Sequence, residues 1–170
     1  MHISEGSGGP VRGIGMSSGE ELLVRKIRDG TVIDHIEAGH ALDVLRILGI
    51  TGKKGSTVSI AINIPSGRLG RKDIVKVEGR ELEQREVDKI ALIAPKATIN
   101  LIQNFKVTRK EGVKLPPKIV GIVKCTNPSC VSNCKEPILH SFIVESAEPL
   151  RLRCYYCNRI AEKEDVLKQF

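Results

Sequence analysis

The chain has no tryptophan, and its 170 residues include only two tyrosines and three phenylalanines. With aromatics at 3% of the composition, the hydrophobic core must be built from aliphatic side chains. Proteins that bind single-stranded nucleic acid stack successive bases on aromatic rings, and the predicted sheet offers chiefly Phe105 for that purpose. The scarcity of aromatics therefore argues against a nucleic-acid platform.

Long apolar segments are missing as well. No run approaches the ~20 residues that a membrane helix needs, so we expect no membrane partner. The N-terminal sequence MHISEGSGGPVRGIGMSSGEE also lacks the apolar segment of a secretory signal. We therefore expect a cytoplasmic protein, and in that compartment paired cysteines indicate metal ligands before disulfides.

The sequence also lacks recognisable catalytic and phosphate-binding-loop motifs. The glycines of GSGGP (6–10) and PSGRLGRK (65–72) have neither the Walker spacing nor a G-x-G-x-x-G placed after a strand. Asp34 and His35 have the residue types for acid–base work, but no serine or cysteine nucleophile is marked beside them. A surface or capping pair is the simpler interpretation, and we expect no enzymatic activity.

What the chain does have is a basic surface. Its 27 lysines and arginines against 20 aspartates and glutamates give a net charge of +7. This excess suits an anionic ligand, an acidic protein partner or nucleic acid. The candidate anion ligands lie on or beside predicted strands rather than in one run, which slightly favours a localised ligand: Lys72, Lys76, Lys106 and Lys110.

Hydrophobic periodicity divides the chain into a disordered arm (1–19), a first domain (20–112), a stiff linker (113–118) and a second domain (119–170). The first domain reads strand, helix, strand, strand, helix, strand. This order predicts an α+β fold of the ferredoxin-like, split βαβ type, with an antiparallel sheet and both helices on one face. The predicted strands are 22–36, which a turn at Asp29-Gly30 interrupts, 57–64, 73–79 and 98–107, and the predicted helices are 38–48 and 87–94.

All five cysteines lie in the second domain, which we expect to be small, β-rich and similar to a zinc ribbon. Cys154 and Cys157 have the spacing of a zinc knuckle, and the upstream pair is either Cys125 with Cys130 or Cys130 with Cys134. Four thiolates leave no coordination position for a reactive water, so the predicted zinc is structural. It supplies folding energy to a domain of about 50 residues, which rarely sustains a core alone.

From these patterns alone, two functions remain. One is a nucleic-acid-binding protein with a zinc ribbon, and the other is an interaction subunit whose first domain senses a small anion. A preference for free nucleotide or for polynucleotide separates them.

Four stretches, in this order, resemble the regulatory chain of aspartate carbamoyltransferase: GTVIDHIEAGHALDVLRIL, IAINIPSGRLGRKDIVKVEG, VDKIALIAPKATINLI and CTNPSC…CYYC. The resemblance covers about residues 21–160. It implies a non-catalytic subunit that controls pyrimidine biosynthesis. Its allosteric domain binds CTP, ATP and UTP and forms a regulatory homodimer, and its zinc domain docks on the catalytic chain. Two catalytic trimers and three regulatory dimers make the assembly.

The resemblance also implies the residues of both sites. Lys76 contacts the base and ribose, Lys110 contacts the phosphates, and Asp34 and His35 line the site. The full implied nucleotide-binding set is Ile27, Asp34, His35, Lys72, Ile74, Lys76, Asn100, Ile102, Phe105, Val107 and Lys110. The implied ligands of one structural zinc per chain are Cys125, Cys130, Cys154 and Cys157, and Cys134 lies outside the family pattern.

Overall fold

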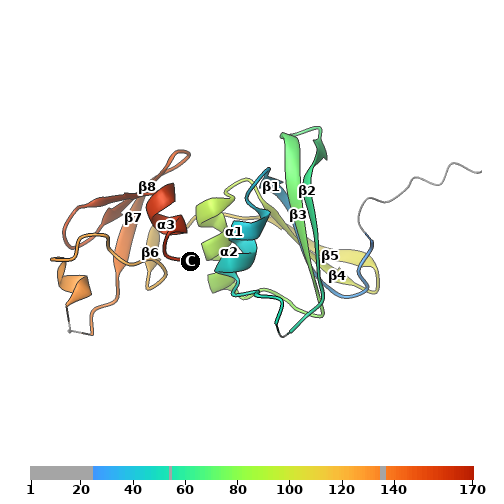
Figure 1. The fold of residues 1–170 in the computed structure, drawn as a ribbon, viewed down its shortest axis with the longest axis horizontal. Coiled ribbons are helices and arrows are strands. Elements are labelled where there is room, and N and C mark those ends of the chain that lie inside the picture. The colour runs from blue at the N-terminus through green and yellow to red at the C-terminus, as the bar shows by residue number, and fades with distance from the viewer. Residues whose placement is uncertain (1–24, 54, 135–136) are drawn as a thin grey trace, which may run out of the picture.

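The computed structural model describes residues 25–53, 55–134 and 137–170, which form two domains (Figure 1). The arm predicted at 1–19 lies outside these residues. Within the described ranges, every helix falls short of the length and apolar character of a membrane span.

The first domain is a five-stranded antiparallel sheet with two helices on one face, which confirms the predicted α+β fold. The strand order is β2-β3-β1-β4-β5, and its first four strands have the ferredoxin-like arrangement. The elements are β1 Gly30–Glu37, α1 Ala41–Ile47, β2 Val58–Ser66, β3 Gly70–Glu78, α2 Gln84–Ile93, β4 Thr98–Gln103 and β5 Lys106–Gly112.

The prediction of one strand over 98–107 was wrong. Asn104 and Phe105 adopt positive φ angles of 49° and 63°, which reverse the chain between β4 and β5. The turn is held by the segment that leads into β1, because Phe105 N donates to Arg28 O at 2.9 Å and Asn104 N to Asp29 Oδ1 at 2.9 Å. The alternation of apolar residues ran through the turn without a Gly or Pro to mark it, so periodicity alone missed the break.

Strand alternation gives the first sheet two different faces. Ile33, Val75 and Val77 are fully buried against the helices. The buried carboxylate of Asp73 lies on the same side and accepts backbone N–H groups from Gly39 at 2.9 Å, Ala41 at 3.0 Å and Asn63 at 2.8 Å. It therefore fixes the turn from β1 into α1, whose own N-cap side chain makes no capping hydrogen bond.

The second domain is a small antiparallel sheet with strand order β6-β7-β8-β9, which confirms the expected β-rich architecture. A C-terminal helix, α3, was not predicted, because its five residues are too few to show a periodic pattern. The elements are β6 Lys118–Val120, the 3₁₀ helix η1 Val131–Asn133, β7 Ser141–Ala147, β8 Leu150–Cys154, β9 Ile160–Glu162 and α3 Lys163–Leu167.

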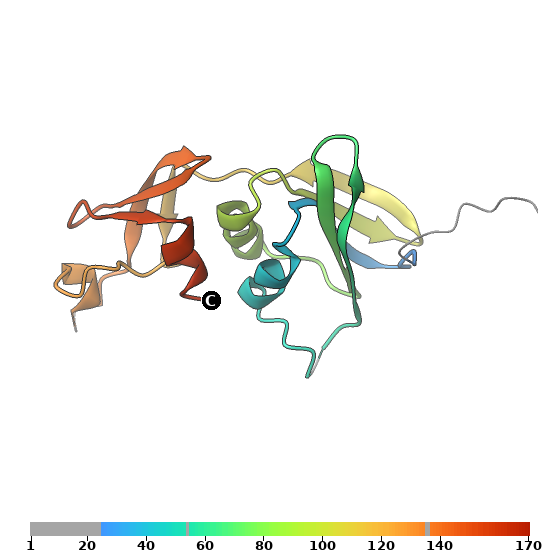
Figure 2. The same cartoon turned by 45° about the horizontal axis from the view of Figure 1, so that its top comes forward.

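Helices α1 and α2 lie between the first sheet and the second domain, so the molecule has three layers (Figures 1 and 2). Ile47, Leu92 and Ile93 turn away from the sheet and join one hydrophobic cluster with Leu150 and Val166 of the second domain. Burial of each such side chain contributes about 1.5–3 kcal/mol. The second domain thus completes its core with side chains of the first.

A four-cysteine metal centre and a candidate ligand-binding face

Two short loops present the upstream and downstream cysteines of the second domain. Between Cys125 and Cys130 the chain makes a turn in which Cys130 N donates to Asn127 O at 3.0 Å. The Asn133 side chain ties this loop by donating to Cys125 O at 2.9 Å and Asn127 O at 2.6 Å. The downstream loop begins at the end of β8 with Cys154 and is closed by Asn158 N, which donates to Cys154 O at 3.0 Å.

The sulfur atoms of Cys125, Cys130, Cys154 and Cys157 all lie within 4.8 Å of one another. Cys125 Sγ and Cys157 Sγ are 3.5 Å apart, and Cys130 Sγ and Cys154 Sγ are 3.8 Å apart, so these thiols are not joined as disulfides. A zinc–sulfur bond of ~2.3 Å sets the edge of a ZnS₄ tetrahedron at about 3.8 Å. The donor set and its spacing fit one structural zinc.

Two of these thiols differ in their ionisation. Burial raises the pKa of Cys125 to about 12. Burial acts in the same direction on Cys157, but hydrogen bonds from the Arg159 backbone and the Asn127 side chain outweigh it and lower its pKa to about 6. A divalent cation bound between the four sulfur atoms stabilises the thiolate form of each.

Cys134 lies outside the cluster. It is exposed, and its thiol donates to the Cys130 carbonyl oxygen at 3.6 Å. The groups that contact the cluster from outside are different: Ser132 Oγ lies 3.2 Å from Cys130 Sγ, and His140 Nδ1 lies 3.0 Å from Ser132 Oγ. His140 therefore supports a sulfur ligand through Ser132, a role that sequence spacing did not indicate.

The residues implied for nucleotide binding gather on the face of the first sheet that the helices leave open. In one row across four strands, Val32 pairs with Lys76 on one side and with Asn100 on the other, and Asn100 pairs with Lys110. Alternation places the other strand-borne members on the same face: Asp34, Lys72, Ile74, Ile102 and Val107. Val32 was not in the predicted set, although the alternation in GTVID places it beside Asp34.

An ion pair lies at the centre of this face. Lys72 Nζ is 2.7 Å from Asp34 Oδ1, and His35 N donates to the same oxygen at 2.7 Å. His35 adopts a φ of 57° at a bulge in β1 between Ile33 and Ile36. A non-glycine residue in this conformation carries strain that its surroundings must offset.

Electrostatics link the lysines of the face to His35. Burial lowers the pKa of His35; the charge of Asp34 opposes this, whereas Lys72, Arg68 and Lys110 lower it further. The imidazole is therefore neutral near pH 7. Its buried Nδ1 lies 3.3 Å from Asp34 Oδ2 but lacks a hydrogen-bond partner among the described residues.

Three members of the implied set have contacts or positions that the cross-strand row does not explain: Ile27, Lys76 and Phe105. Lys76 Nζ donates to Arg25 O at 2.8 Å, so the segment before β1 reaches the open face. Burial lowers the pKa of Lys76, and Asp34 partly offsets that effect. Ile27 is buried, whereas Phe105 is 60% exposed at the tip of the β4–β5 turn and does not stack within the row.

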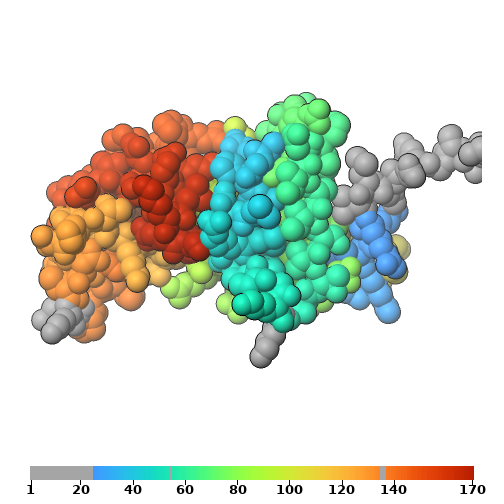
Figure 3. Space-filling model, viewed as in Figure 1, coloured from blue at the N-terminus to red at the C-terminus, as the bar shows by residue number. Residues whose placement is uncertain are grey.

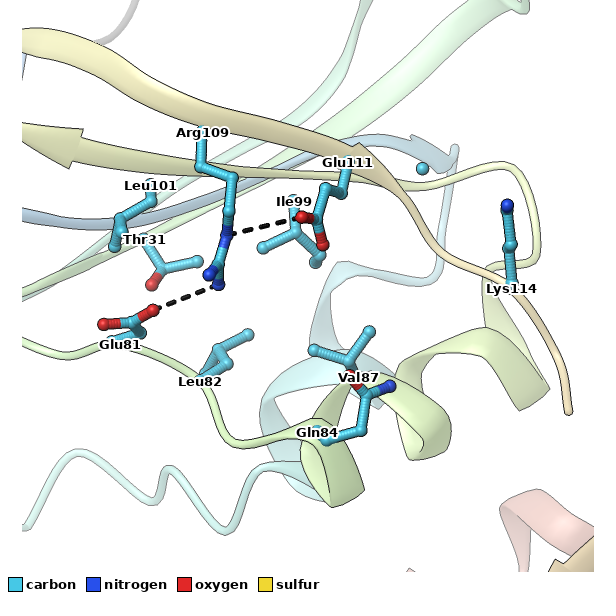
Figure 4. A pocket seen from close by; sticks show the side chains of 11 residues that line it. Thr31, Glu81, Leu82, Gln84, Val87, Ile99, Leu101, Arg109, Glu111 and Lys114 are labelled. Atoms are coloured by element: carbon cyan, nitrogen blue, oxygen red, sulfur yellow. Dashed lines mark hydrogen bonds and ion pairs between the residues drawn. The ribbon is translucent and has the colours of Figure 1, made fainter.

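A pocket of about 490 Å³ lies on the opposite face, between β5 and the start of α2 (Figure 4). Three of its charged groups pair with each other: Arg109 Nη2 is 3.0 Å from Glu81 Oε1, and Arg109 Nε is 3.6 Å from Glu111 Oε1. Thr31 Oγ1 donates to Arg80 O at 2.7 Å. Because these polar groups already have partners, the pocket is a weaker candidate than the open face.

Comparison with known proteins matches both domains. Residues 22–114 match the family model "Aspartate carbamoyltransferase regulatory chain, allosteric domain", and residues 117–167 match "Aspartate carbamoyltransferase regulatory chain, metal binding domain". An aspartate carbamoyltransferase regulatory chain of Korarchaeum cryptofilum is 56% identical over 151 residues, 88% of this chain and 96% of its own length. Those of Hyperthermus butylicus and Methanothrix thermoacetophila are 54% and 58% identical, over 91% and 84% of this chain and 97% and 96% of their own lengths.

Replacing Cys154 and replacing Cys134 should have different effects on zinc binding. Cys154→Ser should lose zinc and unfold the second domain, because metal binding contributes on the order of 10 kcal/mol to so small a domain. Zinc per chain and tyrosine fluorescence measure this directly, since the only two tyrosines, Tyr155 and Tyr156, lie between two ligands. Cys134→Ser is the control and should retain one zinc. Loss of metal from that variant, or full zinc in Cys154→Ser, would contradict the assignment.

Proposed function

The chain belongs to the family of aspartate carbamoyltransferase regulatory chains, and from this premise we propose that it is a nucleotide-responsive subunit of that enzyme. Its first domain binds CTP, ATP or UTP on the open face of the sheet. Its zinc domain docks on a catalytic chain, and the chain itself supplies regulation and no chemistry. The observation that carries the proposal is the cross-strand row that brings Lys76, Asn100 and Lys110 to one face.

The chemistry of this row suits a nucleoside triphosphate. Lysine ammonium groups act as point charges for phosphates, and the exposed Lys110 lies at the β5 end of the row. Lys76 and Asn100 flank Val32, so a base and ribose laid across β1 meet one donor on each side. The half-buried Ile74 supplies apolar surface beside them, as side chains of ligand sites commonly do.

The Asp34–Lys72 pair explains how occupancy can be sensed. Without ligand, Lys72 is neutralised by Asp34 at 2.7 Å. A triphosphate brings several negative charges and competes with Asp34 for this lysine. His35 lies beside this pair, with its Nδ1 3.3 Å from Asp34 Oδ2, so a ligand that draws Lys72 from Asp34 also changes the charges around His35.

The two edges of the first sheet support a dimer formed through β2. Strand β5 carries charged residues such as Lys106 and Arg109, which discourage pairing with another strand. Strand β2 has the sequence VSIAINIPS without a single charge and exposes Ile60 by 39% and Ile62 by 50%. Pairing β2 with the β2 of a second chain covers these side chains and gives the backbone groups of both β2 strands hydrogen-bond partners.

The zinc domain has an exposed apolar patch suited to docking. Its members are Val120, Leu139, Tyr155 and Tyr156, with exposures of 45%, 66%, 56% and 38%. Tyr156 Oη donates to Leu139 O at 3.2 Å, the two tyrosine rings pack edge to face at 5.4 Å, and Val120 and Leu139 line one shallow pocket. Aromatic anchors with a polar tip are typical of protein interfaces. We assign this patch to the catalytic chain, within an assembly of two catalytic trimers and three regulatory dimers.

Lys110 and Lys76 should differ in their effect on nucleotide binding. Lys110→Ala should weaken CTP, ATP and UTP alike, by about 10-fold for one lost charged contact, because all three carry the same phosphates. Lys76→Ala should instead change the discrimination among nucleotides. Calorimetric affinities for each nucleotide, with a single-stranded oligonucleotide as the competing class of ligand, provide the measurement.

Lys114→Ala is the matched control, since it removes the same charge at the pocket on the other face of the sheet. It should bind nucleotides as the unmodified chain does. Native affinity for every nucleotide in both Lys110→Ala and Lys76→Ala would show that the open face is not the site. Tighter binding of the oligonucleotide than of any triphosphate would favour the nucleic-acid alternative.

Substitutions on the two proposed assembly surfaces should disrupt dimer formation and docking independently. Ile62→Lys places a charge on the β2 edge and should convert the isolated chain from dimer to monomer, while its binding to catalytic trimers persists. Tyr155→Ser should weaken binding to catalytic trimers and leave the dimer intact. Sedimentation velocity with and without catalytic trimers distinguishes the two, and an unchanged dimer in Ile62→Lys would exclude β2 as the interface.

A further inference from the structure

We propose that a polar cluster between the two domains transmits nucleotide occupancy from the open face to the zinc domain, an inference that rests on the proposed function. The cluster consists of Glu37, His40, Lys96, Glu148 and Lys163, and is called the interdomain clasp below. Glu37, His40 and Lys96 belong to the first domain, and Glu148 and Lys163 to the second.

The clasp crosses the interface in both directions. Lys96 Nζ lies 3.1 Å from Glu37 Oε1 in its own domain and 3.1 Å from Glu148 Oε1 in the other. Lys163 Nζ reaches back, 3.1 Å from His40 Nε2 and 3.9 Å from Glu37 Oε2. Hydrogen bonds to Glu148 and then to Glu37 raise the pKa of Lys96, so its charged form is favoured. Glu37 is the shared member, because it meets one lysine from each domain.

His40 contributes a single acceptor to this cluster. Its Nδ1 is 2.9 Å from Asp43 Oδ2, and a carboxylate can only accept, so the ring proton is assigned to Nδ1. The lone pair on Nε2 then faces Lys163 and accepts from its ammonium group. Lys163 is therefore held by an imidazole nitrogen on the turn that joins β1 to α1 and by the carboxylate of Glu37, the last residue of β1.

This turn is connected to the open face through two neighbouring residues of β3. Lys72 points to the open face and pairs with Asp34 at 2.7 Å. The next residue, Asp73, points to the opposite face and holds Gly39 N at 2.9 Å and Ala41 N at 3.0 Å, on either side of His40. A phosphate that draws Lys72 from Asp34 therefore acts on the same piece of backbone that positions His40.

Strand β1 provides a second connection. The bulge at His35 separates Asp34 from Glu37, so the ligand-facing carboxylate and the clasp carboxylate lie on either side of the strained residue. A bulge is a point where a strand can change its local twist without disturbing the paired segments around it. A shift at Asp34 thus reaches Glu37 within one short segment.

The apolar part of the interface does not fix the relative orientation of the two domains. Ile47, Leu92 and Ile93 pack against the second domain, and hydrophobic contact is non-directional. It holds the domains together and tolerates small sliding. The charged pairs have preferred directions and set the relative orientation. Figure 3 shows the red surface of the C-terminal residues, which include α3, next to the cyan surface of α1. The contact between Lys163 Nζ and His40 Nε2, at 3.1 Å, joins these two parts of the chain.

Two variants test the clasp in the holoenzyme assembled with catalytic trimers. Lys163→Met removes the ammonium group but keeps an apolar stem, and Glu148→Gln removes one charge with almost no change in shape. CTP affinity by calorimetry should stay at the native value in both. The CTP-induced shift in the aspartate concentration at half-saturation should shrink by about 2-fold or more in Lys163→Met, and by less in Glu148→Gln. Glu145→Gln is the control, because this residue pairs with Arg153 at 2.7 Å inside the second domain, and its shift should be native.

A native CTP response in both clasp variants would overturn this inference and leave the proposed function intact. Failure of the unmodified holoenzyme to bind CTP would instead overturn the proposed function. If Lys163→Met does not assemble, Glu148→Gln decides alone: a reduced response supports the clasp, and a native response refutes it. An equal loss of response in Glu145→Gln would also refute it, because any charge removal in the second domain would then suffice.

Discussion

The second domain depends on one zinc ion held by four thiolates. Cys125, Cys130 and Cys154 are themselves buried members of its hydrophobic cluster, so the metal lies inside the core that it stabilises. That cluster also contains Ile47, Leu92 and Ile93 from the helices of the first domain. Removing the metal therefore opens the surface on which α1 and α2 pack. The zinc supports the joint between the domains as well as the fold of one of them.

The three layers place the open face of the first sheet and the metal centre at opposite ends of the molecule. The open sheet face lies on the side away from the second domain, and the helices separate them (Figure 2). A ligand on that face cannot touch the zinc domain, so any regulation must pass through the helical layer or around its edge. The turn held by Asp73 lies at this edge and contacts both ends. This geometry suits a subunit that reports occupancy and performs no chemistry.

Local patterns predicted the sheet and the metal, but not the contacts that join distant segments. Alternation of apolar residues in β2 was visible in sequence, and the Cys154–Cys157 knuckle was recognisable by spacing. The choice between Cys125 and Cys134 as the partner of Cys130 required the family pattern, and the structure brings Cys125 and Cys130 to the cluster. The Asn104–Phe105 turn carries no Gly or Pro signal. Asp73 and Lys163 act through partners 34 and 123 residues away, a separation that no local pattern encodes.

The central claim is that nucleotide binding on the open face is transmitted across the Asp73-held turn to the zinc domain. Hydrogen–deuterium exchange of the holoenzyme with and without CTP tests it most directly, because the Gly39 and Ala41 amides donate to Asp73 and report on the turn itself. We predict altered exchange in three places: strands β1 and β3, residues 39–41, and helix α3. Changes confined to the strands, with residues 39–41 and α3 unaffected, would contradict the account.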